Sequence, residues 1–338
     1  MNGTSVSRFS FARIRPGARA VVAALAVAGL VAGCGGADSG NADSTSGAPA
    51  TRVITGTGLG DVEIPSEPKR VVAGWLVGTL LVDIGVTPVG MFDDLKKNAS
   101  PAALDKIKDV PSVGGVETSV NLEKIVELEP DLIVTMFRPG MKNIELESLQ
   151  EIAPTVAIEI VDPSHVWANY AKVADVVGKG ADATMKLSDL DKTWADIAIS
   201  DKDKIAGIGE VVYAEGSAQA GNFQIATNTA LVYERLTKSG LTYFSGADPK
   251  PARYNQQISL EDLSRLSSAN AIFFEADIDG KPTARTQALL DSPVFKALPA
   301  AVAGNVFPLR TPYAYTFEAA ELQAEDIRGA IEKFKPAA

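Results

Sequence analysis

Short apolar segments alternate with helix-forming segments through most of this chain. Val71–Trp75 and Leu132–Phe137 have the length and composition of buried strands, whereas Leu122–Leu128 carries apolar residues at helical spacing. The alternation resumes with a strand at 210–215 and helices at 230–239 and 260–266. Strands that alternate with helices form largely parallel sheets covered by helices. The sequence therefore predicts an α/β fold.

One stretch, residues 165–204, contains no strand pattern. Two helical segments, 167–177 and 181–199, follow each other there, and the second is long and heavily charged. We interpret it as a rod between two α/β lobes; the alternative is a long surface helix within one domain. The predicted division is an N-terminal lobe at 52–180, a linker helix at 181–203 and a C-terminal lobe at 204–338.

The amino terminus has the pattern of an export signal. Residues 1–33 contain four arginines and no acidic residue, and their apolar run at 20–32 is too short to span a bilayer. The run ends in Val31-Ala32-Gly33-Cys34, which resembles the lipobox of bacterial lipoproteins. We therefore expect a signal peptide at 1–33, a lipidated Cys34 on the extracytoplasmic face of the cell membrane, and a disordered tether at 34–51. The alternative is an ordinary signal peptide or signal anchor in which Cys34 has no role.

Composition excludes several functions. Removal of residues 1–33 leaves 28 basic residues against 42 acidic ones, a net charge of −14, which argues against nucleic acid as a partner. Cys34 is the only cysteine and His165 the only histidine, so a zinc site or a thiol enzyme is not expected. The glycine-rich turn Gly56-x-Gly58-x-Gly60 is not followed by a helix pattern, so it is not a dinucleotide fingerprint. An enzyme is therefore not expected.

The motifs of residues 52–338 resemble, in order and spacing, a known family. These motifs are Gly58-x-Gly60-x-Val62-x-Ile64-Pro65, Pro68-x-Arg70-Val71-Val72, Gly85-Val86-x-Pro88-Val89-Gly90, Val113-Gly114-Gly115, Asn121-Leu122-Glu123-x-Ile125, Leu128-x-Pro130-Asp131-Leu132-Ile133, Ile152-Ala153-Pro154-Thr155-Val156, Ile258-Ser259-x-Glu261-x-Leu263, Leu298-Pro299-Ala300 and Gly304-x-Val306. The chain resembles the substrate-binding proteins of ABC importers for iron–siderophore complexes, haem and cobalamin.

That resemblance implies two Rossmann-like α/β lobes joined by a single long helix, with the ligand in the cleft between them. It implies a monomer without a cofactor that delivers an iron(III)–siderophore complex to the permease dimer of an ABC importer. By their motif positions, Glu123 and Glu261 would dock onto the permease. A simpler explanation of both glutamates is helix-start electrostatics, since each follows a capping residue, Asn121 or Ser259.

Candidate cleft residues follow the predicted strands, because ligands of α/β folds bind beyond the carboxyl ends of strands. Arginine offers paired donors to the anionic oxygens of a ferric chelate, and aromatic rings offer contact area. The candidates are Trp75, Arg138, Arg253, Tyr254, Arg310 and Tyr313. For each arginine the alternative is an ion-paired surface residue.

Other ligands stay open at this point. Haem or cobalamin is the main alternative, although a single histidine disfavours haem. Direct binding of Fe(III) through tyrosines and carboxylates is a further alternative, which Tyr313 and Tyr315 raise. A purely structural envelope lipoprotein would have no cleft.

Overall fold

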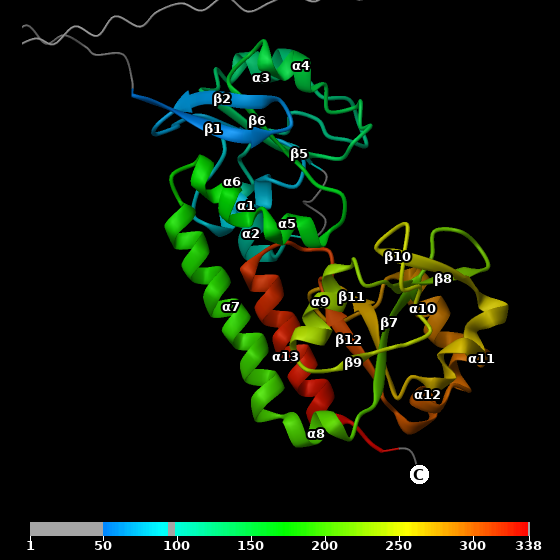
Figure 1. Cartoon of the computed structure of the whole chain (residues 1–338). Coiled ribbons are helices and arrows are strands. Elements are labelled where there is room, and N and C mark those ends of the chain that lie inside the picture. Colours follow the sequence, from blue (N-terminus) through cyan, green and yellow to red (C-terminus); the bar gives the residue numbers. More distant parts are fainter. Residues whose placement is uncertain (1–49, 94–98, 337–338) are drawn as a thin grey trace, which may run out of the picture. The chain divides into compact units, whose positions relative to one another are not determined.

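The computed structural model describes residues 50–93 and 99–336 (Figure 1). These residues belong to one compact unit. The predicted signal peptide, the predicted lipidation site Cys34 and nearly all of the predicted tether lie outside the described residues. The described part opens with an antiparallel hairpin of β1 (Thr51–Thr57) and β2 (Gly60–Pro65), in which Arg52 pairs with Ile64. The glycine-rich turn thus joins two strands.

The N-terminal sheet is entirely parallel, with strand order β4-β3-β5-β6. Its inner strand β5 is buried from Leu132 to Met136, because helices cover the sheet. The strands are β3 (Val71–Ala73), β4 (Gly90–Met91), β5 (Leu132–Phe137) and β6 (Thr155–Glu159). The helices are α1 (Gly78–Asp83), α2 (Pro101–Ile107), α3 (Leu122–Glu127) and α4 (Leu146–Gln150).

A run of helices separates this sheet from the second one. It comprises α5 (Ser164–Ala168), α6 (Tyr170–Val176), α7 (Gly180–Ser200) and α8 (Lys202–Ala206). Helix α7 has 21 residues and is largely exposed, with Ala183, Trp194 and Ile197 buried. At 1.5 Å per residue it spans roughly 30 Å. The predicted long helix is therefore present, whereas the exact lobe boundaries stay a prediction.

The C-terminal sheet is mixed, with strand order β10-β8-β7-β11-β12 and β9 paired to β7. Its strands are β7 (Glu210–Gly216), β8 (Asn222–Ala226), β9 (Thr242–Tyr243), β10 (Asn255–Ser259), β11 (Ala271–Ala276) and β12 (Val306–Arg310). Strands β8 and β10 run antiparallel to their neighbours. The short β7–β8 connection allows only that pairing, because a parallel crossover needs a dozen or more residues.

The remaining helices surround the second sheet. They are α9 (Leu231–Lys238), α10 (Ala284–Asp291), α11 (Pro293–Lys296), α12 (Pro299–Ala303) and α13 (Phe317–Lys333). Helix α13 runs beside α7 (Figure 1). Its first turn also contacts the N-terminal lobe, where the Ser100 hydroxyl donates to Glu318.

The segment at 260–266 differs from its prediction. It forms a 3₁₀ helix, η2 (Leu260–Ser268), and not an α-helix. Leu260, Leu263 and Leu266 recur every third residue, which matches the three residues per turn of a 3₁₀ helix, and the last two are fully buried. The predicted caps are confirmed: the Asn121 side chain accepts from Lys124 N at 2.9 Å, and Ser259 Oγ from Glu261 N at 3.3 Å.

Candidate functional site

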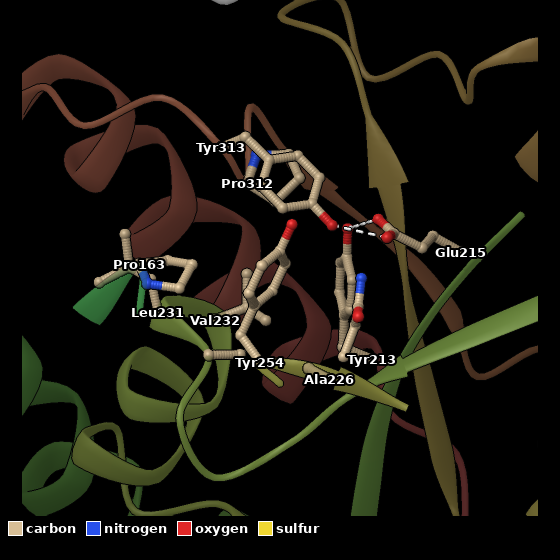
Figure 2. A pocket seen from close by; sticks show the side chains of 11 residues that line it. Pro163, Tyr213, Glu215, Ala226, Leu231, Val232, Tyr254, Pro312 and Tyr313 are labelled. Atoms are coloured by element: carbon tan, nitrogen blue, oxygen red, sulfur yellow. Dashed lines mark hydrogen bonds between the residues drawn. The ribbon is translucent and has the colours of Figure 1, made fainter. Parts of the chain in front are cut away.

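A pocket lies where β7 and β8 end, in the position that the strand-end rule predicts for a ligand (Figure 2). Its enclosed volume is small, about 10 Å³, which is room for one water-sized group. One lining residue, Pro163, comes from the segment between β6 and α5 of the N-terminal lobe. The full lining is Pro163, Tyr213, Glu215, Ala226, Ala230, Leu231, Val232, Tyr254, Asn255, Pro312 and Tyr313.

Glu215 forms the polar floor of this pocket. Its side chain accepts hydrogen bonds from the hydroxyls of Tyr313 (2.6 Å to Oε1) and Tyr213 (2.9 Å to Oε2), as Figure 2 shows. Glu215 is only 7% exposed. Burial raises its pKa to about 7, against the opposing effect of the tyrosine hydrogen bonds. Burial also raises the pKa of Tyr213 and Tyr313 well above the usual value for a phenol.

A second carboxylate, Glu275 of β11, lies close to Glu215. Its Oε2 accepts from Thr283 Oγ1 at 2.7 Å and from Thr286 Oγ1 at 2.8 Å. After burial, the charge of Glu275 contributes to the raised pKa of Glu215. The charge of the exposed Arg285 lowers the pKa of Glu215. Neither carboxylate belongs to an ion pair among the residues that the structure describes.

Trp75 and Arg138 form a pair in the N-terminal lobe. They follow the neighbouring strands β3 and β5, and Arg138 Cζ lies 5.2 Å from the centroid of the Trp75 ring. Arg138 Nε is buried and has no hydrogen-bond partner among the residues that the structure describes. The Arg138 charge lowers the pKa of Tyr315, although burial raises that pKa overall. Arg138 is therefore electrostatically coupled across the lobe boundary to a tyrosine of the C-terminal lobe.

Tyr254 and Tyr313, two of the candidate cleft residues, both line the pocket. Burial raises the pKa of Tyr313 and of Tyr315, and the Tyr254 charge adds to this effect at both residues. Arg253, in contrast, is exposed and lines a separate hollow beside β8 and β10. Its backbone oxygen accepts from Thr227 Oγ1 at 2.8 Å.

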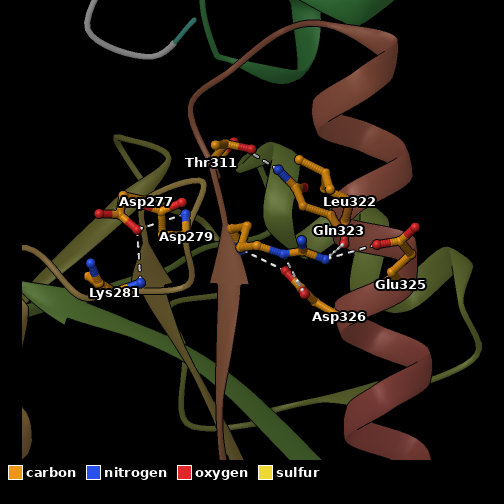
Figure 3. Close-up of polar contacts among 9 residues, drawn as sticks. Asp277, Asp279, Lys281, Thr311, Leu322, Gln323, Glu325 and Asp326 are labelled. Carbon is orange, nitrogen blue, oxygen red and sulfur yellow. Dashed lines mark hydrogen bonds and ion pairs between the residues drawn. The ribbon is translucent and has the colours of Figure 1, made fainter. Parts of the chain in front are cut away.

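Arg310 is bound to helix α13 and does not line the pocket. Its Nε donates to Asp326 Oδ1 at 2.8 Å, and its Nη2 donates to Glu325 Oε2 at 3.0 Å and to Leu322 O at 3.2 Å. These three partners are labelled in Figure 3. This is the ion-paired arrangement that sequence reasoning held as the alternative, so we leave Arg310 out of the proposed site.

The other predicted residues lie away from this pocket. Glu123 and Glu261 are exposed in the first turns of α3 and η2, and their docking role stays a prediction. His165 Nδ1 accepts a hydrogen bond from Val161 N at 3.1 Å. The histidine lines a different groove, formed by α5, α7 and α9.

Sequence reasoning missed Tyr213 and Glu215. Tyr213 lies within an apolar strand and would be assigned to the core. Glu215, however, comes at the end of that strand, so the rule that selected Arg138 could have found it.

Comparison with known proteins identifies the family. The family model described as periplasmic binding protein matches residues 71–313. The chain belongs to this family of periplasmic binding proteins. Among the relatives, the Fe(3+)-citrate-binding protein YfmC of Bacillus subtilis is 29% identical to this chain. The match covers 82% of this chain and 84% of YfmC. The iron(3+)-hydroxamate-binding protein YxeB of the same species is 33% identical in a match that covers 53% of this chain and 51% of YxeB.

Solved structures of periplasmic binding proteins share the fold. The siderophore periplasmic binding protein from the fuscachelin gene cluster of Thermobifida fusca superposes with a TM-score of 0.71 at 26% identity. The match covers 79% of this chain and 98% of that one. The prediction of two α/β lobes joined by a long helix is thereby confirmed. Within residues 50–93 and 99–336, no helix has the length and apolarity needed to cross a membrane.

Proposed function

We propose that this periplasmic binding protein captures a ferric siderophore outside the cytoplasm and delivers it to an ABC importer. The family match and the iron-chelate binding of the named relatives support this function. The observation that carries it is Arg138, whose Nε is buried beside Trp75 and has no hydrogen-bond partner within residues 50–93 and 99–336. A guanidinium in that state is suited to the anionic oxygens that surround Fe(III) in a chelate.

The alternatives have weaker support. His165 already accepts a hydrogen bond and does not line the pocket, so it is poorly placed to ligate haem iron. Cobalamin requires no protein ligand, so the binding experiment described below includes it.

The cluster of Tyr213, Tyr313 and Glu215 favours one other candidate, direct binding of Fe(III) to phenolate and carboxylate oxygens. Both phenols would have to ionise, and burial raises their pKa. Visible absorption after addition of iron citrate tests this candidate, because phenolate-bound Fe(III) has a charge-transfer band.

The experiment is a titration of the purified protein, followed by tryptophan fluorescence. The panel comprises ferric hydroxamate, catecholate and carboxylate siderophores, their iron-free forms, haem and cobalamin. We expect saturable quenching by one ferric siderophore class and much weaker quenching by its iron-free form. Saturation by haem or cobalamin alone would overturn the siderophore assignment.

Two variants locate the quenching. Trp75→Phe removes the fluorophore beside Arg138, whereas Trp194→Phe removes a buried one on α7. Most of the ligand-dependent quenching should disappear in the first variant and remain in the second. Equal loss in both would place the ligand elsewhere.

Attachment and docking complete the proposal. Lipidation of Cys34 would hold the protein at the extracytoplasmic face of the membrane, and mass spectrometry of the amino-terminal peptide tests it.

Glu123 and Glu261 would each meet basic residues of one permease subunit. Their exposure in the first turns of α3 and η2 supports this role, because a docking residue must be accessible.

A further inference from the structure

The floor of the pocket presents only hydrogen-bond acceptors. A tyrosine hydroxyl has one hydrogen, and Tyr213 and Tyr313 both direct theirs to Glu215. The phenol oxygens and the carboxylate therefore have only lone pairs left for a ligand. An anionic oxygen of a chelate finds no donor among Glu215, Tyr213 and Tyr313, whereas an N–H group finds several acceptors there; Tyr254 and Asn255 line other parts of the pocket.

The charge of this wall is also uncompensated. Glu215 is 7% exposed and its neighbour Glu275 lies beside it, yet neither forms an ion pair among the described residues. A buried carboxylate is stabilised when a cation reaches it, because burial has removed most of its water. Arg285 is exposed, and its charge lowers the pKa of Glu215 without an ion pair between the two among the described residues.

Two polar groups on the two lobes thus have opposite character. Arg138, which lies beside Trp75 and outside the lining of this pocket, contributes an unsatisfied donor from the N-terminal lobe, and Glu215 contributes a buried acceptor from the C-terminal lobe. A ligand that satisfies both must present anionic oxygens at one end and a charged donor at the other.

We propose that the pocket selects ferric chelates that carry a protonated amine or guanidinium apart from their iron-binding groups, with Glu215 as the counter-ion. This inference rests on the proposed function and adds the class of siderophore. Glu215 would be a specificity-determining residue, since it discriminates by charge among chelates with the same iron-binding core.

A purely structural role for Glu215 makes a different prediction. In that case the carboxylate only joins β7 to the segment between β12 and α13 through Tyr313. Its replacement would then weaken all chelates equally or lower stability, and the charge of the ligand would not matter.

The experiment compares two forms of one chelate. Ferrioxamine B ends in a primary ammonium, and acetylation of that amine removes the charge while leaving the hydroxamate core unchanged. Calorimetric titrations of the purified protein at pH 8 measure both affinities for wild type, Glu215→Gln and Tyr313→Phe. Tyr313→Phe is the control for the loss of one hydrogen bond to Glu215. Because that bond lowers the pKa of Glu215, all three proteins are also titrated at pH 9, where the carboxylate is ionised.

We expect wild type to bind the ammonium form at least about tenfold more tightly than the acetylated form. Glu215→Gln should bring the two affinities within about twofold by weakening the ammonium form alone, whereas Tyr313→Phe should keep the preference. The wild-type comparison needs no variant, so it decides the question even if Glu215→Gln fails to fold.

Equal affinities in wild type would overturn the inference and leave the proposed function intact. The inference is also overturned if neither form of ferrioxamine B binds and the siderophore panel identifies an anionic or uncharged chelate as the ligand. If no ferric chelate of any class binds, the proposed function itself fails and the inference with it.

Discussion

Asp83 Oδ2 accepts a hydrogen bond from the backbone N–H of Phe317 at 2.7 Å, and the two residues are 234 positions apart. The same oxygen accepts from the Tyr170 hydroxyl at 2.7 Å. The Tyr170 and Phe317 rings meet edge to face, with centroids 4.8 Å apart. One carboxylate of the N-terminal lobe therefore holds the start of α13, which follows the last strand of the C-terminal lobe.

Asp83→Ala should lower the free energy of unfolding by about 2–4 kcal/mol, since it leaves two donors without an acceptor in a largely buried site. Asp83→Asn should cost less than about 1 kcal/mol, because the amide keeps one acceptor oxygen. Burial already raises the pKa of Asp83, so loss of its charge is well tolerated. Urea denaturation of both variants measures the difference. Equal losses would show that the charge, and not the acceptor, matters.

Two arginines should give opposite results. Arg138→Ala should weaken ligand binding by at least about tenfold with little effect on stability, because its guanidinium forms a cation–π contact and, in the described part of the chain, no ion pair. Arg310→Ala should lower the free energy of unfolding by about 2–4 kcal/mol, since it leaves Asp326 buried without its partner. Its effect on affinity should be negligible. Parallel titrations and thermal melts check both, and a binding defect in Arg310→Ala would restore that residue to the site.

Glu215 should make stability depend on pH. Its pKa is raised by burial to about 7 in the folded state, above its usual value. The folded state therefore holds its proton more tightly than the unfolded state does. The resulting stabilisation is fully present below about pH 4.5, where both states are protonated, and is lost as the pH rises to about 7.

Over that window wild type should lose about 3 kcal/mol relative to Glu215→Gln, which cannot ionise. Melting temperatures of the two proteins from pH 4 to pH 8 measure the difference. The groups that face Glu215 are Tyr213, Tyr313, Glu275 and Arg285, and burial raises the pKa of both tyrosines, which moves them further above this window. Parallel curves would mean that Glu215 keeps the same charge in both states.

Charge reversal of the exposed glutamates tests permease docking. Glu123→Lys and Glu261→Lys should each reduce cellular uptake of the chelate by at least about tenfold, because a repulsive contact replaces a complementary one. The affinity of the purified protein should not change, since neither residue lines the pocket. Glu147→Lys is the matched control, as Glu147 is also an exposed first-turn glutamate. Equal uptake defects in all three variants would indicate a general effect of charge.

The fold class and many elements were predictable because they depend on local patterns. The apolar run of β5 and the length of α7 can be recognised from consecutive residues. The caps Asn121 and Ser259 were predictable for the same reason. The antiparallel β8–β10 pair was not predicted, since its polar residues hide a half-buried strand pattern in which Phe223, Ile225 and Ile258 are buried.

The sequence by itself determined the α/β class, the strandless helical segment and the strand-end position of Arg138. Only the tertiary structure decided which polar residues meet. Tyr313 reaches Glu215 from 98 positions away, and Arg310 turns to Asp326 on a helix that packs beside its strand. Both outcomes depend on sheet order and helix packing. A pattern in neighbouring residues cannot encode them, because the partners become close only after distant segments have folded together.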